Sequence, residues 1–281
     1  MAGKKNLMPT YDNVYPEIRK YDKDTIVMYE PVTWGIMSNK QLLGTGFDHP
    51  PGNDAQRTAL SWHYYCWIIQ INNDPLKNGT FPIFEKIFCD DWQINTYFKS
   101  IEIEVATNLG TSPSFLTEFG TCSIKVHGSD PHKFNIDECK VILKAADNHM
   151  QSWTYWDAEF YYYDTWQVRD DLVDIFSRVY PMATNGIPVS IDYDVDKKKF
   201  QYVYNINARS LKQANLKTEI FVPKHAYPNG FVVFAPAFLT WNYDSNTNRV
   251  YFQLTDEIVG HFEKNRLFSF EQQAKIAILP K

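Results

Sequence analysis

The 281-residue sequence has no apolar run of about 18 residues, the length that a helix needs to cross a bilayer. It also has no excess of basic residues, since it contains 28 Lys and Arg and 33 Asp and Glu, which give a net charge of −5. We therefore expect neither a membrane-spanning segment nor a nucleic-acid partner. The N-terminal residues are charged and polar and do not form a signal peptide.

Cysteine is scarce, and none of the cysteines has the spacing of a metal site. The four cysteines are Cys66, Cys89, Cys122 and Cys139. An even number allows one or two disulfides, with three possible pairings for two, and four reduced thiols are the alternative. His127 and His132 lie near Gly128 and Pro131 and are explained as exposed loop residues. We expect no bound metal.

A lone carboxylate ends a short apolar segment at residues 115–120 (FLTEFG). Phe-Leu-Thr is typical of a buried strand, and Gly120 permits a sharp turn after it. Glu118 would then lie at the C-terminal end of a strand, where barrel enzymes carry their catalytic groups. The alternative is an ordinary ion-pairing or capping glutamate.

Three further β-prone segments alternate with helical ones, at residues 25–32, 60–66 and 152–157. The intervening stretches include amphipathic patterns near residues 137–148 and 169–176, the first with acids in its first turn. Strands that alternate with helices indicate a parallel sheet. The fold class is therefore α/β, and the pattern fits half of a (β/α)8 barrel.

After Pro181 the pattern changes to short segments of period two, for example residues 189–195 and 200–206 with a polar turn between them. Several such strands with turn signals predict an all-β sandwich. We therefore divide the chain into a barrel part, residues 1–180, and a β-sandwich domain, residues 181–281.

Several motifs occur in an order and spacing that resemble the C-terminal part of endoglycoceramidases, in glycoside hydrolase family 5. They are residues 29–35 (YEPVTWG), 61–66 (SWHYYC), 115–120 (FLTEFG), 152–156 (SWTYW), 178–181, 218–223 and 227–231. The resemblance covers nearly the whole chain. It implies a retaining hydrolase without a cofactor, which cuts between the oligosaccharide and the ceramide of glycosphingolipids.

The resemblance also implies roles for four residues. Glu118 matches the nucleophile, at the end of the seventh barrel strand, and Tyr65 matches a tyrosine that hydrogen-bonds it. His63 matches a histidine that contacts the sugar, and it shares a strand face with Tyr65 because the two are two residues apart. Trp156 is expected to form the floor for the sugar ring, with Trp153 as the alternative.

One part of the family pattern is absent. The acid/base of the family is the glutamate of an Asn-Glu-Pro motif, which occurs nowhere in these 281 residues. We therefore expect a fragment that lacks the first half of the barrel, or else a non-catalytic derivative that binds glycolipid or carbohydrate. Glu30, also at a strand end, could face the cleft, with a structural carboxylate as the alternative.

The family resemblance suggests where the protein acts. Its substrate would be a glycosphingolipid at a membrane surface or in a micelle, and the protein would be secreted or lysosomal, with its signal peptide in the missing half. Asn78-Gly79-Thr80 fits an N-glycosylation acceptor. The sequence does not indicate an oligomeric state.

Overall fold

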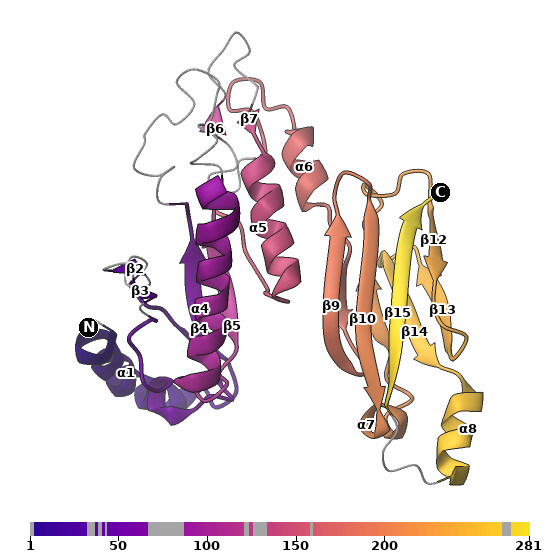
Figure 1. Cartoon of the computed structure of the whole chain (residues 1–281), viewed down its shortest axis with the longest axis horizontal. Helices are drawn as coiled ribbons and strands as arrows, with labels where there is room; N and C mark the ends of the chain where they lie inside the picture. The colour runs from indigo at the N-terminus through magenta and orange to yellow at the C-terminus, as the bar shows by residue number, and fades with distance from the viewer. Residues whose placement is uncertain are drawn as a thin grey trace. The chain divides into compact units, whose positions relative to one another are not determined.

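A computed structural model gives the structure of the chain (Figure 1). Its described residues are 3–32, 37–38, 41–42, 44–66, 87–120, 124–125, 134–157, 160–265 and 271–281. Contacts divide the chain into two compact units, Met1–Glu159 (unit 1) and Phe160–Lys281 (unit 2). The boundary expected after residue 180 stays a prediction.

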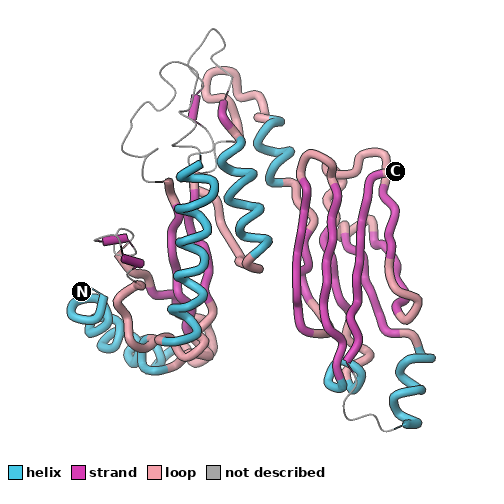
Figure 2. The backbone as a smooth tube through the Cα atoms, in the orientation of Figure 1, coloured by secondary structure: helices cyan, strands magenta, loops and turns pink. Residues whose placement is uncertain are grey.

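Unit 1 is built on a parallel sheet with the strand order β1-β4-β5. Figure 1 labels β4 and β5, and Figure 2 draws the strands in magenta. These strands are β1 (Val27–Tyr29), β4 (Thr58–Tyr64) and β5 (Ser114–Phe119). Beyond β5, a single parallel bridge joins Leu116 to Trp153. The segment after the helix α5 (Asp137–Asn148) thus takes the place of the fourth expected strand, and the order is that of consecutive strands in a half barrel.

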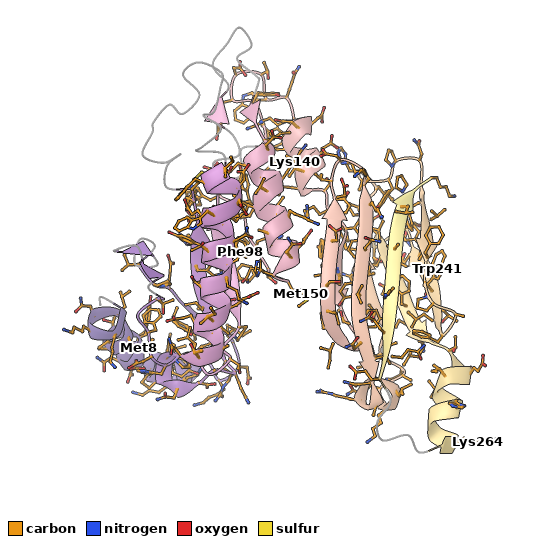
Figure 3. All side chains as sticks on the ribbon, viewed as in Figure 1. Met8, Phe98, Lys140, Met150, Trp241 and Lys264 are labelled. Atoms are coloured by element: carbon orange, nitrogen blue, oxygen red, sulfur yellow. A yellow bond between two sulfur atoms is a disulfide. The ribbon has the colours of Figure 1, made fainter. Side chains whose placement is uncertain are left out.

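One face of β4 packs against helix α4 (Ile94–Thr107). The Trp62 ring lies 4.9 Å from the ring of Phe98, which Figure 3 labels, and the Tyr64 ring lies 5.6 Å from that of Tyr97. All four rings are buried. Because side chains alternate along a strand, burying Trp62 and Tyr64 against the helix directs Ser61 and His63 to the opposite face.

Further helices and short strands belong to unit 1. The helix α5 (Asp137–Asn148) has the predicted bounds, and Asp137 and Glu138 in its first turn complement the helix dipole. The remaining elements are α1 (Met8–Tyr21), η1 (Gly3–Leu7), η3 (Pro51–Asn53), η4 (Phe88–Gln93), β2 (Met37–Ser38), β3 (Gln41–Leu42), β6 (Ile124–Lys125) and β7 (Phe134–Asn135).

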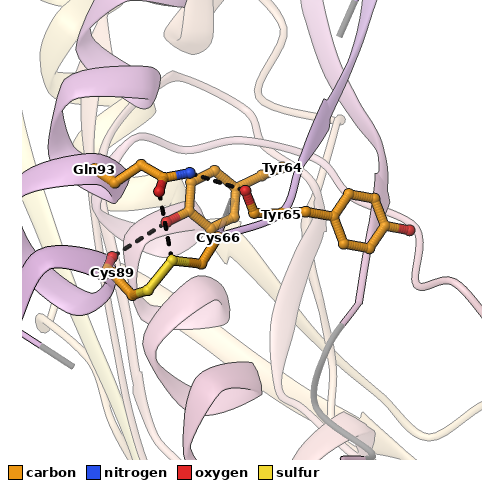
Figure 4. Close-up of a disulfide and its surroundings, with 5 residues drawn as sticks. All are labelled: Tyr64, Tyr65, Cys66, Cys89 and Gln93. Carbon is orange, nitrogen blue, oxygen red and sulfur yellow. Dashed lines mark hydrogen bonds between the residues drawn. A yellow bond between two sulfur atoms is a disulfide. The ribbon is translucent and has the colours of Figure 1, made fainter. Parts of the chain in front are cut away.

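A disulfide joins Cys66, just after β4, to Cys89 in η4 (Figure 4). Cys139 is disulfide-bonded as well, and Cys122 lies outside the described residues. The disulfide alternative of the sequence analysis is therefore confirmed for Cys66, Cys89 and Cys139. The Asn78-Gly79-Thr80 triplet and the loop histidines His127 and His132 also lie outside the described residues.

Unit 2 consists mainly of two antiparallel four-stranded sheets, with the orders β12-β15-β10-β9 and β13-β14-β11-β8. Phe200 and Ile278 of the first sheet share one buried core with Ile220 and Phe252 of the second. This core confirms the predicted β-sandwich. Its strands are β8 (Tyr180–Ala183), β9 (Ile187–Asp194), β10 (Lys199–Asn207), β11 (Thr218–Phe221), β12 (Phe231–Phe234), β13 (Leu239–Asp244), β14 (Arg249–Leu254) and β15 (Glu271–Pro280).

Three elements of unit 2, namely β8 and the helices α7 (Ala208–Lys212) and α8 (Asp256–Asn265), were not predicted from the sequence. Pro181 argues against a strand, but β8 is at the edge of its sheet, where a missing N–H costs no ladder hydrogen bond. The helix α8 follows β14 directly. The helices α6 (Asp170–Phe176) and α7 complete the unit. Within the described residues, no helix is long and apolar enough to cross a membrane.

The disulfide yields a test of stability. Its cysteines are 23 residues apart, so loop-closure entropy predicts a loss of about 3 kcal/mol when both are replaced. In the variant C66A/C89A we expect the free energy of unfolding of unit 1 to fall by about 3 kcal/mol. It is measured by urea denaturation, with fluorescence as the signal. The free energy of unfolding of unit 2 should not change. A loss below about 1 kcal/mol would contradict this prediction.

Candidate functional site

The carboxyl ends of β4 and β5 bring the predicted site residues to one edge of the sheet. His63 lies in β4, and Tyr65 is the first residue after that strand. Glu118 is the penultimate residue of β5. The two strands are parallel neighbours, so their C-terminal ends meet. This edge is where parallel α/β sheets carry their ligand sites.

A β-bulge interrupts the register of these two strands. Trp62 pairs with Leu116, and the next residue of β4, His63, pairs with Glu118, so β5 contributes one extra residue, Thr117. Both Leu116 and Phe119 are completely buried. The bulge therefore changes the alternation in β5, so that Glu118 lies opposite His63 rather than opposite Tyr64.

Tyr65 donates a short hydrogen bond from its hydroxyl to Oε1 of Glu118. Burial raises the pKa of the Tyr65 phenol well above its ordinary value, and the hydrogen bond and charge of Glu118 raise it further. The phenol therefore stays a proton donor at any physiological pH. The hydrogen bond that it donates fixes the orientation of the Glu118 carboxylate.

His63 lies between two carboxylates. Its Nδ1 is 3.7 Å from Oε2 of Glu118, and its Nε2 is 3.4 Å from Oε1 of Glu30. The Glu118 side chain is 26% exposed, which leaves it accessible to a ligand. Glu30 thus belongs to the same cluster, next to His63, as its position at a strand end suggested.

Gly120 is needed here for a close approach. A Cβ at this position would lie 2.6 Å from the carbonyl oxygen of Trp156 and 2.9 Å from the Tyr65 ring. Contacts this short do not occur for real side chains, so any larger residue must displace the ring or the backbone. The glycine after the glutamate therefore lets the Tyr65 ring reach Glu118.

The two tryptophans after α5 differ in their surroundings. The Trp153 ring packs edge-on against Phe119, with 5.7 Å between the ring centroids. Trp156 donates its backbone N–H to the Phe119 carbonyl, while its side chain is 61% exposed. Trp156 is thus the more exposed of the two, and its role as the sugar platform stays a prediction.

Several contacts fix the end of β4 on the other side of the strand. Gln93 donates its Nε2 to the Tyr65 carbonyl at 2.8 Å, and the Tyr64 hydroxyl donates to the Cys89 carbonyl at 3.1 Å. Figure 4 shows the Tyr65 ring pointing away from the disulfide, whereas the Tyr64 ring lies beside it. The disulfide and Gln93 thus anchor the backbone that carries Tyr65.

Within the described residues, no group of three or more His, Cys, Asp or Glu is arranged to hold a metal ion. The chemistry available at this edge is that of two carboxylates, a phenol and an imidazole. Sequence reasoning missed Thr117 and Gly120 as parts of the site. A glycine two residues after the glutamate was visible in the sequence. Its need for space depends on Tyr65, which is 55 positions earlier in the chain.

The raised pKa of Tyr65 can be measured by NMR of ¹³Cζ-labelled tyrosine, with Tyr65→Phe to assign the signal. An ordinary tyrosine titrates near pH 10. We expect the Tyr65 signal not to titrate up to about pH 11. In Glu118→Gln the carboxylate is lost, so the pKa of Tyr65 should fall, although burial still keeps it raised. Titration of Tyr65 at its ordinary pH in the unmodified chain would contradict the hydrogen bond.

Two family models match the chain. Residues 2–161 match the family "Cellulase (glycosyl hydrolase family 5)", which is more than half of the chain. Residues 178–262 match "Glycoside hydrolase family 5 C-terminal domain". The endoglycoceramidase of Cyanea nozakii is 26% identical over 260 residues, which are 86% of this chain and 44% of that protein. Endoglycoceramidase I of Rhodococcus hoagii is 27% identical, over 81% of this chain and 43% of its own length.

Solved structures share the fold. The complex of endo-glycoceramidase II from Rhodococcus sp. with ganglioside GM3 has a TM-score of 0.70 at 18% identity, over 99% of this chain and 55% of that one. Sterylglucosidase 1 of Cryptococcus neoformans has a TM-score of 0.65 at 14% identity, over 99% of this chain and 44% of that one. This chain spans about half the length of these proteins. On the family match over residues 2–161, the chain belongs to glycoside hydrolase family 5.

Proposed function

We propose that this chain carries the nucleophile half of a retaining glycosidase that cuts glycosphingolipids between oligosaccharide and ceramide. The observation that supports it most is the carboxylate of Glu118 at a barrel strand end, hydrogen-bonded by Tyr65. The names of the curated relatives, endoglycoceramidases of Cyanea nozakii and Rhodococcus hoagii, support the substrate class.

The proposed mechanism begins with attack of Glu118 on the anomeric carbon. Oε1 accepts the hydrogen bond of Tyr65, so Oε2 is the oxygen free to form the glycosyl–enzyme bond while the bond to the leaving oxygen breaks. Water then hydrolyses the intermediate, which gives overall retention. Tyr65 holds Oε1 of Glu118 in a fixed orientation, because a phenol of raised pKa stays protonated and remains a hydrogen-bond donor.

The other proposed contacts are with the sugar. His63 has one nitrogen near each of Glu118 and Glu30, and its imidazole would hydrogen-bond a sugar hydroxyl. Trp156 has an exposed ring, and an aromatic face suits the apolar side of a pyranose. No cofactor or metal is needed for this chemistry.

The leaving ceramide oxygen needs a proton, and general acid catalysis is worth about 10²–10⁴-fold. Asn-Glu-Pro does not occur in this sequence. The chain spans 44% of the Cyanea nozakii relative. We propose that the acid/base belongs to a further part of the protein. The disulfide Cys66–Cys89 agrees with a secreted or lysosomal location, because such bonds persist in oxidising compartments.

A second candidate follows from the same missing motif. The chain alone could bind glycolipid or carbohydrate without cleaving it. The experiment below separates the two functions, because it supplies a substrate whose leaving group needs no acid.

The test uses 2,4-dinitrophenyl β-lactoside, since dinitrophenolate leaves without protonation. We expect the chain to release a burst of dinitrophenolate, and we expect azide to accelerate turnover and yield the β-configured lactosyl azide. Glu118→Gln should reduce the burst rate by at least about a thousandfold, because the nucleophile is removed. Glu17→Gln, on the exposed face of α1, is the matched control and should behave like the unmodified chain.

Three outcomes would contradict the proposal. They are an unchanged burst in Glu118→Gln, an α-configured azide product, or no burst at all. In the last case, retained binding of lactosylceramide in phosphatidylcholine vesicles would favour the non-catalytic function.

A further inference from the structure

The direction of Glu118 depends on the bulge in β5. In a regular register, the pair Trp62–Leu116 would be followed by His63–Thr117 and then Tyr64–Glu118. Glu118 would then share the side of Tyr64, which packs against Tyr97 of α4. With the bulge, Glu118 lies opposite His63 and reaches Tyr65 instead. One extra residue therefore decides whether the carboxylate faces the helix or the open edge.

Thr117 is that extra residue, and neighbouring elements hold it on both sides. Its Oγ1 lies 2.5 Å from Oγ of Ser61 in β4. On the other side, Thr154 donates its hydroxyl to the Thr117 carbonyl. Thr117 also contacts the Trp62 carbonyl with its Oγ1 at 3.4 Å. Both its side chain and its backbone are therefore fixed by segments far away in the sequence.

The hydroxyl pair is partly shielded from water, since Ser61 is only 6% exposed and Thr117 is half-buried. Removing one partner of a buried hydrogen bond leaves the other unsatisfied, which costs about 1–3 kcal/mol. Ser61 shares its strand face with His63 and Tyr65, because the three are two residues apart. The Thr117–Ser61 contact is thus the next layer beneath the site, on the same face as Tyr65 and Glu118.

We propose that Thr117 is a positioning residue for Glu118, and that Ser61 and Thr154 hold the bulge that aims the carboxylate. Thr117 does not need to touch the substrate, because it acts through the backbone of the next residue. The inference rests on the proposed nucleophile role of Glu118. A misplacement of about 1 Å in a reacting group can cost about 10²-fold in rate.

The test compares variants of the full chain by their inactivation with 2,4-dinitrophenyl 2-deoxy-2-fluoro-β-lactoside, which traps a carboxylate nucleophile. Thr117→Val keeps the size and β-branching but removes the hydroxyl. We expect its inactivation rate constant to fall about 10- to 100-fold while the inhibitor's binding constant changes less than about twofold. Thr117→Ser, which retains the hydroxyl, should restore most of the rate.

Two more variants sharpen the test. Ser61→Ala should slow inactivation in the same way, and its effect should not add to that of Thr117→Val, because both remove one contact. Ser114→Ala is the matched control. It removes a hydroxyl of β5 that bonds to Gln151 at 2.9 Å but lies outside the bulge, so the rate should not change.

Failure of the inference and failure of the proposed function give different results. If the unmodified chain is not inactivated, the nucleophile role fails. The ¹³Cζ NMR signal of Tyr65 then reports the position of Glu118. This signal should shift in Thr117→Val, because the hydrogen bond between Tyr65 and Glu118 is lost. If Thr117→Val is folded and reacts like the unmodified chain, or loses binding and rate equally, the positioning role is overturned. If Thr117→Val does not fold, Ser61→Ala decides in the same way.

Discussion

The hydrogen bond from Tyr65 to Glu118 is the contact on which the other features of the site depend. It needs β4 and β5 to be parallel neighbours, a bulge that turns Glu118 toward β4's open face, and a glycine that leaves room for the ring. Trp62 and Tyr64, packed against α4, fix the opposite face of the same strand. The site is therefore a consequence of how the core packs, because that packing decides which side chains are left to face the edge.

The hydrogen bond also gives the two residues different roles, since Tyr65 is the donor and Glu118 is the acceptor. Burial and the neighbouring carboxylate raise the pKa of Tyr65, so the phenol remains a donor, whereas Glu118 is an acceptor with a second oxygen unoccupied by Tyr65. This arrangement is compatible with a carboxylate nucleophile. The family membership gives a glycosidase fold, and the local geometry supports the assignment of the nucleophile within it.

Much of this could be predicted from the sequence, but not the register. The spacing of His63 and Tyr65 indicates a shared strand face, and period-two segments after Pro181 indicate the sandwich, because both signals are local. The bulge at Thr117 is not local, since it depends on Ser61 and Thr154 from neighbouring segments. Strand β8 was missed for the same reason, because Pro181 is tolerated only at an edge that the sequence does not reveal.

The central claim is that Glu118 is the group that attacks the sugar. Peptide mapping of the chain after inactivation by the 2-fluoro lactoside measures this directly, since the covalent sugar marks the nucleophile. The account predicts one adduct, on Glu118, within the peptide that spans residues 115–120. An adduct on Glu30 or on any other residue would contradict it.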